Sequence, residues 1–335
     1  MTSSLQPISD EEYERIAFSS NCAVGIENTP VWDAYDALVG GRELLNGSRY
    51  VWVNGQARAL VTFKWFSVYR MRYLWARSAP SWIGEPPSAE EEALFIEDVR
   101  RLAREAHATF VRMHVWHDHS QMRPPIEDVA YDTTVFVDVG GDYFPGLKKR
   151  GRRDINKARR ECPGVVVDRS DITLEQMRPL VKMLRNTLGD LALPDERYFE
   201  FVEALSKHDA AQLLTCETED GDALGWLVWT KWGRLATYYF SASTPEGKRM
   251  YVPDLLLGEL FERANAAGCD MIDLMGVGSA TTPGLDHLTT FKTKFAPASQ
   301  VAVAGELVIN RARYFTRSEL AKVRHAVRGQ ESVDD

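Results

Sequence analysis

The sequence predicts an α+β protein made of two tandem copies of one unit, and three observations lead to this prediction. The chain has 335 residues, more than one hydrophobic core usually serves, so two domains of about 150 residues are expected. Both halves contain several strand-like runs, then a helix, then another strand. The junctions between that helix and the last strand are also alike, AREAHATFVRMHV in the first half and ANAAGCDMIDLMGV in the second. We place the first domain at residues 1–140 and the second at 141–315.

In the first half, two expected helix starts carry a capping box, in which a serine oxygen and a following glutamate satisfy the free amides of the first turn. These pairs are Ser9 with Glu12 and Ser88 with Glu91, and the second helix is expected to end near Ala106. The pair Asn54–Gly55 predicts a hairpin turn. Strands are expected at Tyr50–Val53, Ala57–Trp65, Arg70–Trp75 and Thr109–Trp116.

The second half repeats this order. Thr173 with Gln176 predicts the start of a helix that ends near Leu188, and another helix is expected over Glu196–Ser206. Pro253 suits the first turn of a helix that ends near Ala267. A last helix is expected over residues 316–330. Strands are expected at Ala211–Thr218, Ala223–Lys231, Leu235–Ser241 and Met271–Met275.

The segment Leu147–Glu161, LKKRGRRDINKARRE, concentrates positive charge. With eight basic and two acidic residues it carries a charge of +6, although the formal net charge of the whole chain is −8. A cationic strip on an acidic protein predicts a local site for one anionic partner, because diffuse binding to a polyanion would need a basic protein. The partner could be a phosphate, a diphosphate or a nucleic acid.

Other features of the sequence limit the classes of protein to which the chain can belong. The four cysteines are scattered without a CxxC pair, which favours reduced thiols and a cytoplasmic location. The N-terminus has no signal-peptide pattern, and no window approaches 18 uninterrupted apolar residues, so no membrane span is expected. The histidines of HVWHDH, His114 to His119, lack a zinc-binding spacing, so no metal site is expected.

The segment SASTPEGKRMYVPDLLL lies where a coenzyme A acetyltransferase has a glycine-rich loop whose amides hold a pyrophosphate. Here only Gly247 is present, followed by the bulky run Lys248–Tyr251 and by Pro253. Large side chains hinder close approach, and proline removes an amide donor. The sequence therefore predicts an acyl donor other than coenzyme A, and no cofactor.

The motif FKTKF, Phe291–Phe295, follows the glycines of Gly276–Gly278 and Gly284. One interpretation is a partly desolvated lysine that faces developing negative charge. The other is a helix whose phenylalanines pack while Lys292 and Lys294 reach solvent. Spacing alone favours the second interpretation.

Three motifs resemble those of the FemABX family of aminoacyl-tRNA-dependent peptidyltransferases. In the basic segment, Arg152 or Arg153, Ile155, Lys157 and Ala158 match a family helix with the pattern R-x-x-I-x-K-A. AAGCDMIDLMGVG followed by GLDHLTTFKTKF resembles the family's apolar strand, glycine turn and FK-x-x-F motif. WARSAP, at residues 75–80, resembles a strand end that reads R-G-P in the family. The likeness extends from about residue 30 to residue 315.

This resemblance implies two acetyltransferase (GNAT)-like domains, each with a mixed, mostly antiparallel sheet flanked by helices. It implies transfer of an amino acid from aminoacyl-tRNA to an amine of a peptidoglycan precursor, without metal or cofactor. The acceptor would be a muramyl pentapeptide nucleotide or its lipid-linked form, and the latter would bring the protein to the membrane surface. The resemblance further implies that the C-terminal segment, with its helix, packs back on the first domain.

The resemblance also implies roles for single residues. Phe291 and Lys292 correspond to the family's FK pair, with the lysine near the reacting ester, and Tyr238 or Tyr239 corresponds to an aromatic residue on the preceding strand. Arg197 in ERYFEF corresponds to an arginine that contacts phosphate of the precursor. Catalytic roles are expected for Lys292, Phe291 and Tyr239. Substrate-binding roles are expected for Arg197, Arg152, Arg153, Lys157, Tyr238 and Lys294.

Two departures from the family pattern concern the acceptor. After Trp32 the chain has Tyr35, Asp36 and Ala37 where family members that hold a uridine diphosphate place a lysine, and His114 stands where a strand ending R-x-D-P has aspartate. A lipid-linked acceptor, or a peptide of antibiotic biosynthesis, therefore stays open. Two other hypotheses also stay open: an N-acyltransferase that uses acyl-coenzyme A, and an RNA-binding protein on an inactive transferase scaffold.

Overall fold

A computed structural model describes residues 3–68, 70–125, 131–188 and 196–315, and in it the chain forms two compact units. The first unit comprises residues 1–30, 36–130 and the chain from 301 onward, and the second comprises 31–35 and 131–300. Each unit combines mixed, mostly antiparallel sheets with flanking helices, which confirms the predicted α+β class. Among the described helices, none is both long enough and apolar enough to cross a bilayer.

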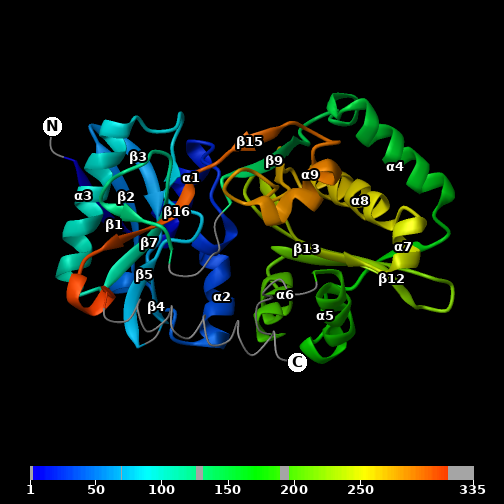
Figure 1. The fold of residues 1–335 in the computed structure, drawn as a ribbon, viewed down its shortest axis with the longest axis horizontal. Coiled ribbons are helices and arrows are strands. Elements are labelled where there is room, and N and C mark those ends of the chain that lie inside the picture. The colour runs from blue at the N-terminus through cyan, green and yellow to red at the C-terminus, as the bar shows by residue number, and fades with distance from the viewer. Residues whose placement is uncertain (1–2, 69, 126–130, 189–195, 316–335) are drawn as a thin grey trace. The chain divides into compact units, whose positions relative to one another are not determined.

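The observed division differs from the expected boundary between residues 140 and 141. Strand β9 (Thr133–Asp138) pairs with β14 and β15, so the second unit already begins at residue 131. Strand β16 (Val303–Val308) pairs with β7 and β8 of the first unit, and it lies among that unit's early strands in Figure 1. Residues 301–315 therefore belong to the first unit. The helix expected over 316–330 lies outside the described residues.

The first unit contains two sheets. One has the order β1-β2-β3-β6 and the other β4-β5-β7-β16-β8, and only β5 and β7 run parallel. The predicted hairpin at Asn54–Gly55 is confirmed, with Gly55 in the left-handed region at φ 75°. The strands are β1 (Ser4–Ile8), β2 (Arg49–Asn54), β3 (Gln56–Val61), β4 (Lys64–Val68), β5 (Met71–Trp75), β6 (Ser81–Trp82), β7 (Phe110–Val115), β8 (Met122–Arg123) and β16.

Two helices of this part of the chain, α1 and α3, begin where the capping boxes predict, whereas α2 was not predicted and has no side-chain cap. The Ser9 and Ser88 hydroxyls each accept a hydrogen bond from the amide of the glutamate three residues later, at 3.2 Å. Helix α3 then buries Phe95, Ile96 and Val99 in a core that includes Trp52. The helices are α1 (Asp10–Ser19), α2 (Pro30–Val39) and α3 (Ala89–Glu105), with 3₁₀ turns at Ile26–Asn28 and Leu45–Gly47.

The second unit is built on one sheet with the order β10-β11-β12-β13-β14-β9-β15. Its strands are β9, β10 (Val165–Asp168), β11 (Ala211–Glu217), β12 (Ala223–Trp232), β13 (Leu235–Ser243), β14 (Met271–Asp273) and β15 (Ala298–Gln300). Its helices are α4 (Lys149–Glu161), α5 (Leu174–Leu188), α6 (Glu200–Ser206), α7 (Pro245–Arg249), α8 (Val252–Ala266) and α9 (Asp286–Lys292), with 3₁₀ turns at Phe144–Gly146, Glu196–Phe199 and Pro283–Leu285.

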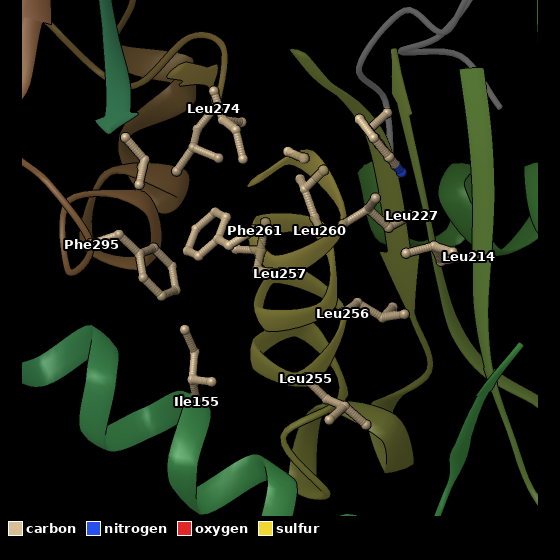
Figure 2. Packing of buried hydrophobic residues seen from close by; sticks show 14 of the residues in the cluster. Ile155, Leu214, Leu227, Leu255, Leu256, Leu257, Leu260, Phe261, Leu274 and Phe295 are labelled. Atoms are coloured by element: carbon tan, nitrogen blue, oxygen red, sulfur yellow. The ribbon is translucent and has the colours of Figure 1, made fainter. Parts of the chain in front are cut away.

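Helix α8 is the centre of the second core. It is apolar around most of its circumference, as expected of a helix that is covered on several sides. Figure 2 shows Leu214 and Leu227 of the sheet on one side of α8, and Ile155 of α4 and Phe295 on the other. Burying each such leucine contributes about 1.5–3 kcal/mol. The core therefore fixes α4 and the end of the FKTKF motif against the same helix.

Candidate active site in the second unit

The sheet of the second unit opens between β13 and β14. The two strands run parallel and pair only over Leu235–Thr237 and Met271–Asp273. Beyond Asp273 the chain stays with β9, because the Leu274 and Val277 amides donate to carbonyl oxygens of that strand at 2.9 and 3.0 Å. Strand β13 meanwhile continues along β12 to Ser243. The two strands therefore separate at their carboxyl ends.

Lys292 lies at this opening. It ends helix α9, and its Nζ donates to the carbonyl oxygens of Met275 at 3.2 Å and of Gly276 at 2.8 Å. The side chain is only 5% exposed, and burial lowers its pKa to about 8, while the charge of Asp273 acts in the opposite direction. The ammonium also lies 5.8 Å from the centroid of the Tyr238 ring. A buried cation with main-chain partners thus stands where the sheet separates.

The glycine turn before α9 places the two carbonyl groups. The Met275 amide donates to the Asp273 carboxylate at 2.7 Å, and Met275 itself has a left-handed backbone at φ 62°. The Gly278 amide donates to the Thr289 hydroxyl of α9 at 2.9 Å. A Cβ at Gly278 would lie 2.6 Å from the Asp286 Cα, so no larger residue fits without a shift of the backbone. The turn is therefore fixed to the helix that carries Lys292.

Tyr238 and Tyr239 lie on opposite faces of β13, as alternation along a strand requires. The Tyr238 hydroxyl hydrogen-bonds the Ser241 hydroxyl, and burial raises the pKa of Tyr238. The Tyr239 ring packs 5.0 Å from the Phe201 ring, and its hydroxyl lies 3.1 Å from that of Tyr198. Of the two tyrosines, Tyr238 is therefore the neighbour of Lys292.

Lys294 is buried in a different environment. Its ammonium forms a hydrogen-bonded ion pair with Asp254 of α8 and lies 3.6 Å from the Asp154 carboxylate of α4. It also lies 4.4 Å from the centroid of the half-buried Phe291 ring. Because Lys292 and Lys294 are both buried, the interpretation in which they reach solvent is excluded. Asp254 was not singled out from the sequence, although an acid in the first turn after Pro253 is a recognisable helix-start signal.

The basic segment and the FKTKF motif, far apart in the sequence, are in direct contact. Helix α4 has no side-chain cap, and main-chain carbonyls replace one: Phe295 accepts from the Lys148 amide at 3.0 Å and Lys294 from the Gly151 amide at 3.1 Å. A Cβ at Gly151 would lie 2.7 Å from the Phe295 ring. The start of α4 is therefore built on the end of the motif.

The basic side chains that were expected to bind substrate lie in different settings. Arg152 donates to the carbonyl oxygens of Pro145 and Leu147, the latter at 2.5 Å, and so braces its own helix start. Arg153 is 70% exposed and pairs with Asp154 at 2.9 Å. The Lys157 ammonium donates to the Tyr251 hydroxyl at 2.5 Å, which raises the pKa of Lys157.

Arg197 lies apart from these groups in sequence, in the 3₁₀ turn Glu196–Phe199 before α6. Its side chain is 65% exposed, and its Nε donates to the Glu200 carboxylate at 3.1 Å. The neighbouring Tyr198 connects this turn to Tyr239 through their hydroxyl groups. Arg197 is thus linked to the face of β13 opposite to Lys292.

The loop between β13 and α8 is closely packed. The Thr244 hydroxyl caps α7 by accepting from the Gly247 amide at 2.9 Å, and a Cβ at Gly247 would lie 2.2 Å from the Leu224 carbonyl oxygen. Gly247 is therefore needed for the close packing of this loop against the Leu224 carbonyl. In the first turn of α8, Pro253 lacks an amide donor, and the buried Asp254 carboxylate is already paired with Lys294.

The histidine-rich segment HVWHDH belongs to the first unit. The buried Glu92 carboxylate accepts from the Trp116 and His117 amides at 2.8 and 2.9 Å and hydrogen-bonds the His119 ring at 2.9 Å. The segment is therefore organised around one carboxylate of α3. Within the described ranges, no group of three or more histidine, cysteine or acidic side chains is placed to hold a metal ion.

Comparison with known proteins concerns the fold of the chain. Residues 147–286, from the basic segment to the start of α9, match the family model of the acetyltransferase (GNAT) domain. The crystal structure of FemX superposes with a TM-score of 0.69 over 94% of this chain and 99% of that chain, at 12% sequence identity. The chain has the FemX fold. The predicted FemABX-like architecture of two tandem GNAT-like units is confirmed. At 12% identity, the similarity to FemX shows the fold alone.

Two other solved structures are more distant. A tandem GNAT protein from the clavulanic acid biosynthesis pathway has a TM-score of 0.49 at 11% identity, covering 92% of this chain and 98% of that chain. The L-PGS structure from Bacillus licheniformis has a TM-score of 0.47 at 12% identity, covering 93% and 96%. Scores this low carry no argument about the present chain. No curated protein matches the sequence.

Proposed function

We propose that this protein is an aminoacyltransferase that moves an amino acid from aminoacyl-tRNA to an amine of a peptide-like acceptor and so forms a peptide bond. A peptidoglycan precursor, either the muramyl pentapeptide nucleotide or its lipid-linked form, is the acceptor we favour. The FemX fold agrees with this proposal, and the environment of Lys292 is the observation that carries it.

Lys292 suits the stabilisation of an oxyanion. An ammonium has three N–H donors, and the Met275 and Gly276 carbonyls accept two of them. The third can donate to the oxygen of a tetrahedral intermediate. Because the side chain is buried, its charge acts in a medium where electrostatic interactions are several times stronger than in water. Phe291, the preceding residue, would pack beside the ester.

The reaction requires few other groups from the protein. The amine lone pair attacks the ester carbonyl carbon, the bond from that carbon to the ribose oxygen breaks, and an amide bond forms. The proton lost by the amine passes to the departing ribose oxygen. The hydroxyl pair of Tyr238 and Ser241 beside Lys292 is a candidate path for that proton, and Tyr239 would support β13 from the other face. An ester is already activated, so orientation supplies much of the remaining rate.

The basic residues of α4 suit the phosphates of a substrate. We propose that the exposed Arg153 and the half-exposed Lys157 contact phosphate directly, while Arg152 positions the helix start. Arg197 is proposed as a further phosphate contact on its exposed turn. Lys294, whose charge is balanced by Asp254, is proposed as a positioning residue for the motif. The closely packed loop before α8, with Gly247 against the Leu224 carbonyl and Pro253 without an amide donor, is the feature that disfavours coenzyme A as the donor.

One assay tests this proposal. The protein is incubated with a pool of labelled aminoacyl-tRNAs and with a muramyl pentapeptide nucleotide, its lipid-linked form or a free peptide amine, with and without ribonuclease. Ribonuclease-sensitive transfer of label is expected, together with a loss of about 10²–10³-fold in Lys292→Met. Lys182→Met, at an exposed lysine of α5, is the matched control and is expected to keep full activity.

The outcomes separate the hypotheses. Transfer from acyl-coenzyme A alone would contradict the proposed donor. Binding of tRNA without transfer to any of the three acceptors would favour an RNA-binding protein on an inactive scaffold. Transfer only to the free peptide would keep the donor and replace the acceptor by a peptide such as those of antibiotic biosynthesis. Undiminished transfer by Lys292→Met would remove that lysine from the mechanism.

A further inference from the structure

The first unit has a pocket that the proposed reaction does not use. It has a volume of about 620 Å³ and lies at the amino ends of the parallel strands β5 and β7. Its walls come from the β4–β5 hairpin, the end of α3 and a helical turn over residues 311–315. The residues that give it chemical character are Trp65, Arg70, Arg72, His107 and Arg313.

The pocket is cationic in an acidic protein. Among the described residues, three arginines line it and no aspartate or glutamate does. Some arginines of this unit pair with carboxylates, as Arg58 does with Glu91 at 2.8 Å. Arg70, Arg72 and Arg313 make no ion pair with any carboxylate in the part of the chain that the structure describes. All three side chains are exposed, so solvent screens their mutual repulsion, and their N–H donors are accessible to an anion that enters the pocket.

Two of the lining residues have an unfavourable backbone. Arg70 and His107 have φ values of 60° and 56°, in the left-handed region where glycine has no steric penalty. Arg70 directly precedes β5 in the β4–β5 hairpin, and His107 follows the last turn of α3. A side chain at such a position costs about 1 kcal/mol relative to glycine. The fold itself calls for a left-handed residue at both positions. Arg70 stands in a hairpin turn, and His107 ends α3, where its amide donates to the Arg104 carbonyl and the Ala108 amide to the Ala103 carbonyl. The sequence places side chains rather than glycine at these two positions.

The other two arginines differ in what is fixed: the side chain at Arg72, and the backbone at Arg313. The Arg72 guanidinium lies 4.4 Å from the centroid of the Trp65 ring, a cation–π contact that restricts its rotamers. Arg313 lies on a turn capped by Asn310, whose side-chain oxygen accepts from the Arg313 amide at 3.0 Å. The next residue, Tyr314, is anchored by its hydrogen bond to the buried Glu306 at 2.6 Å. The Arg72 side chain therefore loses less conformational entropy when a ligand binds.

We propose that this pocket binds a soluble organic phosphate of the size of a nucleotide. Arginine forks match the geometry of phosphate oxygens, and the volume falls in the range of small-molecule sites, about 300–1,000 Å³. A single inorganic phosphate would leave most of the pocket empty. The proposal concerns residues of the first unit alone and does not depend on the aminoacyltransferase activity.

Calorimetric titration of the full chain tests this proposal, with ADP, pyrophosphate and adenosine as probes. Saturable binding of ADP and weaker binding of pyrophosphate are expected, with no binding of adenosine. The double variant Arg72→Gln/Arg313→Gln should weaken ADP binding at least about tenfold. Arg311→Gln removes the same charge two residues from Arg313 without lining the pocket, and it should bind ADP as the unaltered protein does.

His107→Gly separates a binding role from a structural one. Relief of the left-handed strain should raise the melting temperature, while loss of the side chain should weaken ADP binding severalfold. Equal binding of ADP and adenosine, or unchanged binding in the double variant, would overturn the proposal. So would arginine-dependent binding of tRNA or of phosphatidylglycerol vesicles without ADP binding, because the ligand would then be a macromolecule or a lipid surface.

Discussion

Lys292 and Lys294 stand two residues apart in one motif, yet the protein accommodates their charges in different ways. Lys292 has main-chain carbonyl oxygens as its partners, so its charge is buried at a cost and its pKa is lowered. Lys294 has the carboxylate of Asp254, so its charge is balanced. A residue that is unfavourable for stability and aimed at an opening in a sheet is a candidate for catalysis, whereas a balanced pair is a candidate for structure.

The lowered pKa of Lys292 makes a prediction about stability and pH. The unfolded chain holds this proton up to its ordinary pKa of 10.5, but the folded chain releases it near pH 8. Between these values the unfolded state binds more protons, so stability should rise with pH through this window by on the order of 3 kcal/mol. Lys292→Met should lack this rise. Urea unfolding of both proteins at pH 7.5 and pH 10 measures the difference, and parallel pH dependences would contradict it.

Lys294→Met should instead destabilise the protein by about 3–5 kcal/mol, because it leaves the buried Asp254 carboxylate without its main partner. The double variant Lys294→Met/Asp254→Asn should recover much of that loss. Urea unfolding at pH 7.5 provides the comparison, with Lys292→Met as a second variant in which no such loss is expected. A Lys294→Met protein as stable as the original would show that the ion pair contributes nothing.

At the residue scale the sequence could single out FKTKF but could not say what its lysines do. The partner of Lys294 lies 40 residues earlier, in a helix whose packing no local pattern reveals. The resemblance to a family left Tyr238 and Tyr239 undecided, and the assignment of a catalytic role to Tyr239 stays a prediction. Side chains alternate between the two faces of β13, and in the structure Tyr238 is the one that lies beside Lys292.

At the scale of the element, the turn before α9 decides whether Lys292 is correctly placed. Gly278→Ala would bring a Cβ to 2.6 Å from the Asp286 Cα, so either the turn or the helix start must move. The expected cost is about 1–3 kcal/mol, with a loss of transfer activity because the Met275 and Gly276 carbonyls would shift.

Gly284→Ala is the matched control for this prediction. A Cβ there meets nothing within 4 Å, and its backbone is not left-handed, so the change should stay within about 0.5 kcal/mol. Thermal unfolding and the transfer assay are measured on both variants. Equal effects of the two substitutions would contradict the role of the close contact at Gly278.

Elements that local signals specify were predicted well, and elements that depend on distant partners were not. The capping boxes and the Asn54–Gly55 hairpin were correct because their hydrogen bonds lie within a few residues. Strand β1 was missed since it contains Pro7, which an edge strand tolerates but which argues against a strand in the sequence alone. Helix α4 lacks a capping side chain because carbonyls of FKTKF replace it.

At the scale of the whole molecule, the chain leaves the first unit at residue 130 and returns to it at 301. The returning strand β16 lies between β7 and β8, and its Glu306 pairs with Arg112 of β7, 194 residues earlier, at 2.5 and 3.0 Å. Both side chains are fully buried. The sequence could not predict that β16 belongs to the first unit, because the pairing of two strands so far apart in the chain leaves no signal in the local periodicity of either strand.

The return of β16 predicts that one substitution near the C-terminus affects only the first unit. Glu306→Ala removes the buried carboxylate that balances the Arg112 guanidinium and should cost about 3–5 kcal/mol. The cluster that holds Val111 and Leu307 and the cluster that holds Leu214 and Leu227 have no described residue in common, so amide protection should fall in β5, β7 and β16 and persist in β11, β12 and β13. Hydrogen exchange followed by mass spectrometry measures both, with Glu105→Ala at an exposed position of α3 as the control. Equal loss of protection in both sheets would mean that the two units unfold as one.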